Sequence, residues 1–135
     1  MVTLLVVLLL VSHKMKCSKF ENVSFKYEKT NKVSLRDIQV TIPRGGILAL
    51  VGSSGAGKST FADLIPRYYD VTSGKITIDG IDIREITVEN LRSFMGIVSQ
   101  DTILFNDTVA HNISYGLPEA GIDEIREAAK TANAL

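Results

Sequence analysis

The stretch Gly52-Ser53-Ser54-Gly55-Ala56-Gly57-Lys58-Ser59-Thr60 decides the fold of this chain. It fits the pattern G-x-x-x-x-G-K-[ST] without a mismatch. Glycines permit positive φ and carry no Cβ, so successive backbone N–H groups can converge on phosphate oxygens. Lys58 adds a mobile positive charge for the β- and γ-phosphates, and the Ser59 hydroxyl is small enough to coordinate Mg²⁺. The nine residues are therefore predicted to form a phosphate loop that binds a nucleoside triphosphate with Mg²⁺.

The sequence on either side of this loop supports the prediction. Ile47–Val51 is a continuous apolar run, as expected of a strand covered on both faces. Lys58–Ile65 has helical spacing, and Pro66 ends or kinks that helix. The pattern alone would arise by chance in about one chain of this length in several hundred. An ordinary glycine turn between a strand and a helix is therefore disfavoured.

Short elements are predicted over the rest of the chain. Asp79-Gly80 between two apolar runs is a strong hairpin signal. Thr87 and either Asp107 or Thr108 are candidate N-caps, as is Asp123 for a helix from Glu124 onward. The pattern at 20–25 has a loose period of two that allows a bulge. Strands are predicted at 20–25, 35–42, 75–78, 81–83 and 96–99, and helices at 87–94 and 108–113.

Length and composition place narrow limits on the class of protein. A chain of 135 residues favours one domain, and one cysteine, Cys17, excludes an internal disulfide. The 15 basic and 15 acidic side chains balance, which gives no support for nucleic-acid binding. Residues 1–16 form an apolar and then basic N-terminal extension. Its first eleven residues are too short to span a bilayer, which leaves a buried strand, an ill-fitting extension, an interfacial anchor or the tail of a membrane helix.

Several segments, in order, give the chain a family resemblance. Residues 20–116 resemble the first half of the nucleotide-binding domain of an ABC transporter of the exporter type, most like the lipid and multidrug exporters. The stretches that carry the resemblance are FENVSFKY at 20–27, LVGSSGAGKST at 50–60, LIPRYYD at 64–70, GKITIDG at 74–80, and IVSQD at 97–101 leading into LFNDT at 104–108.

The resemblance implies a fold and adds two site residues. It implies an α/β P-loop NTPase fold of the ABC type, incomplete, with an antiparallel β-subdomain that precedes and flanks the phosphate-loop core. Residues 17–135 would be the first half of that domain. Tyr27 matches the family's A-loop aromatic, which stacks on adenine; the alternative is a strand-end tyrosine that packs on the sheet. Gln100 matches the Q-loop glutamine and, with Ser59, would serve Mg²⁺; the alternative is a polar residue after a strand.

The resemblance also implies partners and a place in the cell. ATP and Mg²⁺ would be the ligands. Residues 102–112 resemble the surface that meets the transporter's membrane domain, and exposed Ile103, Leu104 and Phe105 would suit that contact, although burial in this chain's own core remains an alternative. In the intact transporter a second nucleotide-binding domain would pair with this one. The expected location is the cytoplasmic face of a membrane, and no nucleic-acid partner is expected.

The residues that hydrolyse ATP in this family have no match in the sequence. No Ser-Gly-Gly-Gln occurs, and the Asp123-Glu124 pair does not follow four apolar residues. Neither His13 nor His111 lies where the switch histidine would fall. No catalytic residue is therefore assigned, and the chain is expected to bind ATP without efficient hydrolysis. The missing later strands are expected to leave an edge and a face of Ile47–Val51 uncovered. The alternatives are a non-catalytic interaction module that docks on a membrane subunit, and another phosphate-loop enzyme such as a kinase or GTPase.

Overall fold

The structure is a computed structural model that describes residues 2–7, 10–11, 17–28, 33–98 and 103–135. The chain divides into two compact units, Met1–Val98 and Ser99–Leu135. The contacts group within each of these segments, and the single domain expected from the length stays a prediction. Strands are β1 (Val2–Val7), β2 (Leu10–Val11), β3 (Cys17–Lys26), β4 (Val33–Pro43), β5 (Leu48–Ser53), β6 (Ser73–Ile78), β7 (Ile81–Asp82) and β8 (Met95–Gly96). Helices are α1 (Lys58–Leu64), the 3-10 helix η1 (Ile83–Glu85), α2 (Val88–Ser93), α3 (Val109–Ile113) and α4 (Ile122–Thr131).

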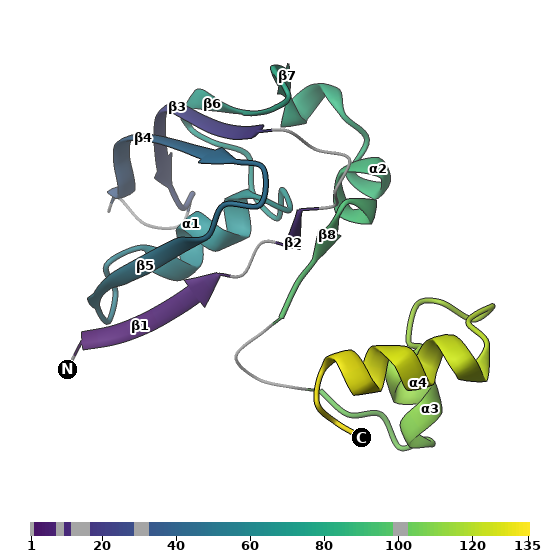
Figure 1. Cartoon of the computed structure of the whole chain (residues 1–135). Coiled ribbons are helices and arrows are strands. Elements are labelled where there is room, and N and C mark those ends of the chain that lie inside the picture. The colour runs from purple at the N-terminus through teal and green to yellow at the C-terminus, as the bar shows by residue number, and fades with distance from the viewer. Residues whose placement is uncertain (1, 8–9, 12–16, 29–32, 99–102) are drawn as a thin grey trace. The chain divides into compact units, whose positions relative to one another are not determined.

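The first unit contains a four-stranded antiparallel sheet in the order β4-β3-β6-β7. This sheet is the expected antiparallel β-subdomain (Figure 1). The bulge allowed by the pattern at 20–25 is confirmed, since the register between β3 and β4 shifts between Phe20 and Val23. Asn22 lies inside that shift with a φ of +48°. Gly74 in β6 packs against the backbone of the same bulge and has a φ of +77°.

The turns and strand ends follow local signals with two exceptions. Asp79 and Gly80 both have positive φ, +52° and +86°, as the predicted hairpin turn requires. The second strand of this hairpin is shorter than predicted, because Ile83 is buried at the start of η1. The strand predicted at 96–99 is also wrong in extent, since β8 covers Met95–Gly96 and the next described residues are outside any strand. Ser99 lies outside the described residues.

Hydroxyl caps begin two of the three helices for which an N-cap is predicted. The Thr87 hydroxyl accepts from the backbone N–H of Asn90 at the start of α2, as predicted. Thr108 does the same for His111 in α3, which selects Thr108 over Asp107 as its cap. The predicted cap of α4 is wrong, because the helix begins after Gly121. There the Glu124 carboxylate accepts from the Gly121 N–H at 3.0 Å, so the acid stabilises the helix from within its first turn.

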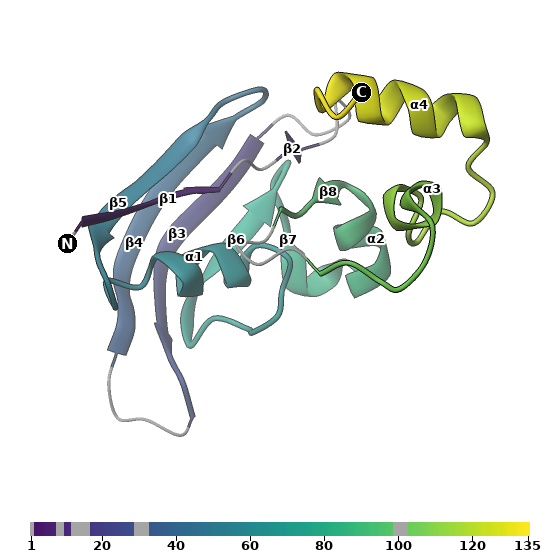
Figure 2. The same cartoon turned by 90° about the horizontal axis from the view of Figure 1, so that it is seen from below.

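The core of the first unit lies between the four-stranded sheet and α1. Figure 2 shows α1 lying along the sheet, where Phe61 stacks on Phe20 with ring centroids 4.3 Å apart. Leu64 and Leu91 are fully buried beside them. The cluster of buried apolar side chains consists of Phe20, Val23, Phe25, Leu35, Ile42, Phe61, Leu64, Ile65, Ile76, Ile78, Ile83 and Leu91. The helix that follows the phosphate loop is therefore anchored by its apolar face.

β5, which leads into the phosphate loop, pairs with the N-terminal strand β1. The antiparallel register runs from Val2 opposite Ser53 to Val7 opposite Leu48. The strand interpretation of the N-terminal segment is confirmed for these residues. Among the described residues β5 pairs with no other strand, so one expected open edge is occupied by β1 and the other is open. None of the helices in the described residues has the length and apolar character to span a bilayer.

The predicted burial of β5 on both faces is wrong. Leu48 and Leu50 pack against the core, whereas Val51 is 66% exposed. The cause is that α1 covers one face of the strand, while the side chains that alternate with Leu48 and Leu50 point to solvent. The expectation of an uncovered apolar face along residues 47–51 is thereby confirmed.

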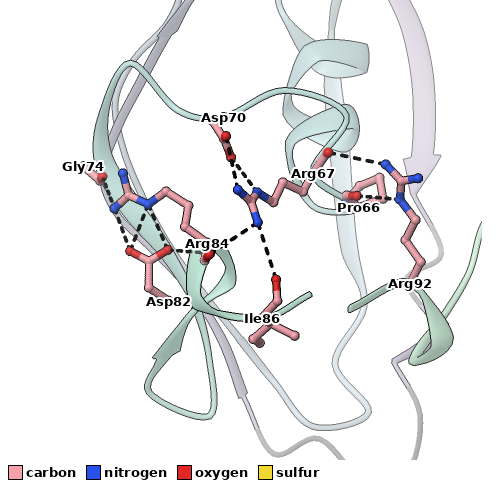
Figure 3. Close-up of polar contacts among 8 residues, drawn as sticks. All are labelled: Pro66, Arg67, Asp70, Gly74, Asp82, Arg84, Ile86 and Arg92. Carbon is pink, nitrogen blue, oxygen red and sulfur yellow. Dashed lines mark hydrogen bonds and ion pairs between the residues drawn. The ribbon is translucent and has the colours of Figure 1, made fainter. Parts of the chain in front are cut away.

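An ion pair between Asp82 and Arg84 joins β7 to η1 (Figure 3). The Asp82 carboxylate accepts from the Arg84 guanidinium at 2.6 Å and from its backbone N–H at 2.9 Å. The hydrogen bond from that guanidinium, followed by the one from the backbone, holds the pKa of Asp82 below its usual value. The Asp82 side chain is 12% exposed, so this interaction is only partly screened by water.

We expect Asp82→Asn to lower the free energy of unfolding by about 1–2 kcal/mol at pH 7. The folded-state pKa is below the unfolded one, so the stabilisation is complete above the unfolded pKa and is lost as pH falls through the folded pKa. Urea unfolding at pH 7 and at about pH 2.5 measures this, with a smaller difference from wild type at the lower pH. Glu85→Gln, on the same 3-10 helix, is the matched control and should change stability by less than about 0.5 kcal/mol. Equal effects of the two variants would contradict the assignment.

Candidate nucleotide site

The loop between β5 and α1 has the backbone geometry of a tight turn into a helix. The Ala56 N–H donates to the Ser53 carbonyl at 3.2 Å, and Gly55 and Gly57 have φ of +78° and +85°. Gly57 is the residue before α1, and a Cβ there would lie 2.6 Å from the Ser34 carbonyl oxygen of β4. Only glycine fits this position, because both the positive φ and the close approach exclude a side chain. The loop is thereby held against β4.

The Lys58 side chain folds back onto the same loop. Its Nζ donates to the carbonyl oxygens of Gly52 at 3.1 Å and Ser53 at 2.8 Å. The ammonium has three N–H donors, so one remains for another acceptor without any rearrangement. The lysine charge is therefore held beside the loop of glycines and serines, where an anionic group could exchange with the two carbonyl contacts.

Ser59 and Thr60 occupy different environments on the first turn of α1. Ser59 is exposed, so its hydroxyl is accessible to a ligand. Thr60 is 7% exposed, and its hydroxyl lies 3.0 Å from the hydroxyl of Tyr27. The other residues of the loop are exposed or half-buried: Gly52, Ser53, Ser54, Gly55, Ala56, Gly57 and Lys58. The other predicted Mg²⁺ residue, Gln100, lies outside the described residues.

Tyr27 is joined to the phosphate loop through Thr60. It follows the end of β3, is half-buried and contacts the rings of Phe25 and Tyr69. The Tyr27 ring packs on neighbours at the strand end, and its hydroxyl reaches the helix that follows the loop, while its adenine-stacking role stays a prediction. Of the sequence-predicted site residues, the structure thus brings Tyr27 and residues 52–60 together.

The segment after α1 carries residues to which the sequence analysis assigned no role. Arg67 pairs with Asp70 at 2.7 Å, and its guanidinium also donates to the carbonyls of Arg84 and Ile86 (Figure 3). Arg92 donates to the carbonyls of Pro66 and Arg67. The Arg-x-x-Asp spacing at 67–70 is a signal for the ion pair, but a backbone acceptor leaves no pattern in the sequence.

The second unit presents apolar side chains before α3. Ile103 and Leu104 are each 77% exposed, and Phe105, 44% exposed, stacks on Tyr115 with ring centroids 4.3 Å apart. Within the second unit these three side chains are therefore exposed, as the predicted contact surface requires. The Asn112 side chain accepts from the Phe105 N–H at 2.7 Å and donates to its carbonyl at 3.1 Å, which fixes this segment on α3. The first predicted residue of this surface, Thr102, lies outside the described residues.

Comparison with known proteins gives consistent matches. The family model described as ABC transporter matches residues 35–135. The chain is 53% identical over 116 residues to the putative multidrug export ATP-binding/permease protein YgaD of Bacillus subtilis, covering 86% of this chain. It is also 53% identical over 116 residues to an ATP-dependent lipid A-core flippase of Syntrophus aciditrophicus, again over 86% of this chain. Among solved structures, a bacterial Atm1-family ABC exporter with ATP bound matches with a TM-score of 0.77 at 38% identity.

These matches cover most of this chain but a small part of the proteins compared. The chain spans about one fifth of the two curated relatives, 20% of the first and 19% of the second. In the structural match, 90% of this chain aligns with 22% of the exporter chain.

Proposed function

Because the chain belongs to the ABC transporter family, we propose that residues 52–60 bind the triphosphate of ATP together with Mg²⁺. The observation that carries the proposal is the loop itself. Gly57 lies so close to the Ser34 carbonyl that no side chain fits, and Lys58 Nζ donates to the loop carbonyls of Gly52 and Ser53. A cradle of backbone with one lysine fits a polyphosphate better than it fits a neutral ligand. The family match replaces the kinase and GTPase alternative.

The other candidate site residues have side chains suited to Mg²⁺ and to the adenine base. The exposed Ser59 hydroxyl is one oxygen ligand suited to Mg²⁺, and Gln100 is proposed as a second. When bound, Mg²⁺ neutralises part of the phosphate charge. The Thr60 hydroxyl links the helix to Tyr27, whose ring we assign to the adenine. Lys58 would exchange its two carbonyl acceptors for phosphate oxygens, so the lysine binds and orients the polyanion.

We further propose that this domain acts within an exporter of lipid or drug-like compounds, at the cytoplasmic face of a membrane. The relatives named as a multidrug export protein and a lipid A-core flippase support this substrate class. A membrane domain and a second nucleotide-binding domain are the proposed partners. The exposed Ile103 and Leu104 beside Phe105 supply an apolar surface suited to the first of these contacts.

The chain by itself is proposed to bind ATP and to leave it intact. Phosphoryl transfer to water requires a residue that positions the attacking water. The 135 residues contain no Ser-Gly-Gly-Gln, and Asp123-Glu124 lies in the first turn of α4 instead of at a strand end. Nothing in the phosphate loop supplies that role.

Calorimetric titration of the full chain with ATP and Mg²⁺, followed by assay of released phosphate, tests both statements. We expect ATP to bind saturably and more tightly than GTP. We expect no release of phosphate above the rate in buffer alone. Absence of binding to ATP and to inorganic tripolyphosphate would refute the phosphate-loop assignment. Phosphate release that Lys58→Ala abolishes would refute the proposed lack of hydrolysis and leave the binding site in place.

A further inference from the structure

Two aromatic rings and one hydroxyl contact Tyr27. Its ring centroid lies 4.8 Å from that of Phe25 and 5.2 Å from that of Tyr69, with interplanar angles of 84° and 87°. Phe25 and Tyr69 also contact each other, with centroids 5.6 Å apart. The third contact of Tyr27 is the Thr60 hydroxyl, 3.0 Å from its own hydroxyl. The edge-to-face contacts set the plane of the Tyr27 ring, and the hydroxyl contact sets its direction.

Of these neighbours, Tyr69 is the one whose position depends on a separate set of contacts. Phe25 lies on β3 with Tyr27 close behind it, whereas Tyr69 comes from the segment that leaves α1. The Arg67–Asp70 ion pair spans that segment from one side of Tyr69 to the other, as Figure 3 shows for the two charged residues. Arg67 has a φ of +57°, which turns the chain sharply at this point.

Hydrogen bonds from arginine side chains to backbone carbonyls hold the same segment on both sides. The Arg67 guanidinium donates to the carbonyls of Arg84 and Ile86, and Arg92 donates to the carbonyls of Pro66 and Arg67 (Figure 3). The Arg92 guanidinium also lies over the ring of Tyr68, 4.8 Å from its centroid. Two arginines thus fix the backbone that carries Tyr69, while the Tyr69 side chain itself is 45% exposed.

We propose that Tyr69 is a positioning residue for base binding: it holds the Tyr27 ring in the orientation that stacks on the adenine of ATP. This inference rests on the proposed function of the phosphate loop. Tyr27 is half-buried, and without Tyr69 one of the two rings that set its plane is gone. The Tyr27 ring would then sample more rotamers before it binds, and the cost of ordering it would reduce the affinity for the base. The phosphates would bind as before, since Lys58 bonds to the carbonyls of the loop whereas Tyr69 packs on the rings of Phe25 and Tyr27.

The test separates base binding from phosphate binding by comparing two ligands. The full chain is titrated with ATP and with inorganic tripolyphosphate, each with Mg²⁺, and the ratio of the two affinities is taken. We expect Tyr69→Ala to lower this ratio about 3- to 10-fold, the equivalent of one edge-to-face ring contact, with tripolyphosphate affinity unchanged within twofold. Tyr69→Phe keeps the ring and should retain the wild-type ratio. Tyr115→Ala removes an exposed tyrosine of the second unit, so it is the matched control and should also retain the wild-type ratio.

A double substitution shows whether Tyr69 acts through Tyr27. Tyr27→Ala should remove the base contribution, and adding Tyr69→Ala to it should lower the ratio no further. The inference is overturned if the two losses add, if Tyr69→Phe behaves as Tyr69→Ala, or if tripolyphosphate affinity falls with that of ATP. A wild-type chain that binds neither ligand overturns the phosphate-loop proposal and this inference together. A chain in which Tyr27→Ala lowers the ratio and Tyr69→Ala does not overturns this inference alone. Thermal unfolding by circular dichroism checks that each variant is folded.

Discussion

Lys58→Ala is expected to weaken binding of ATP by about 2–5 kcal/mol, or about 30-fold to several-thousand-fold in affinity. The ammonium is the one full positive charge within the loop of residues 52–60, and its Nζ already lies 2.8 Å from the Ser53 carbonyl. Removing it leaves the phosphate charges to the backbone N–H groups and the proposed Mg²⁺. The expected loss is the same for inorganic tripolyphosphate, because the lysine serves the phosphates and not the base.

Isothermal titration at fixed salt measures this effect. Lys75→Ala is the matched control, since it removes the same charge from a 49% exposed side chain on β6 that pairs with Glu21 at 3.3 Å. The control should shift ATP affinity by less than twofold, because this charge is exposed to screening by salt and is already paired with Glu21. A change below threefold for Lys58→Ala would remove this lysine from the phosphate site.

The second large effect is on stability, where Gly74→Ala is expected to reduce the free energy of unfolding by about 2–5 kcal/mol. Gly74 has a φ of +77°, and a Cβ there would lie 2.3 Å from the Asn22 carbonyl oxygen and 2.4 Å from that of Glu21. Backbone strain in the left-handed region costs about 1–2 kcal/mol, and displacing packed backbone costs about 1–3 kcal/mol more. Such a loss approaches the whole stability of a small domain.

Gly80→Ala separates the two causes of this loss. Gly80 has a φ of +86°, but a Cβ there would meet nothing within 4 Å. The control should therefore lose only the strain, about 1–2 kcal/mol. Urea unfolding followed by far-ultraviolet circular dichroism compares the variants. Equal losses would show that the bulge of β3 can move away from β6, contrary to the close packing described above.

Local elements could be predicted from the sequence because each signal lies within a few residues of the structure it forms. Asp79-Gly80 specifies a turn with two positive φ values, and Thr87 specifies a helix start through its own hydroxyl. The N-cap predicted for α4 was wrong because two local signals competed. Asp123 is a good cap by type, but Glu124 reaches back to Gly121 and completes the first turn from there.

Pairing between distant segments could not be predicted in the same way. The apolar character of the N-terminal segment favoured a strand among several readings, but nothing local showed that Val2 lies opposite Ser53. The exposure of Val51 followed from which neighbours β5 has, and not from its own composition. For the site, the motif identified residues 52–60, whereas the contact between Thr60 and Tyr27 depends on how β3 and α1 pack. The guanidinium contacts of Arg67 could not be predicted, because backbone carbonyls accept them and a backbone acceptor leaves no pattern in the sequence.

The pairing of β1 with β5 bears on how this protein is best purified. Paired residues in an antiparallel ladder have Cα atoms about 4.5–5.5 Å apart, so Val2 lies next to Ser53 and the mouth of the loop. A polyhistidine tag fused ahead of Val2 would bring several imidazoles to that mouth, where they could chelate divalent ions and compete with a polyphosphate. Affinity handles and fluorophores for titrations therefore belong after Leu135, or an N-terminal tag should be cleaved before any measurement of nucleotide affinity.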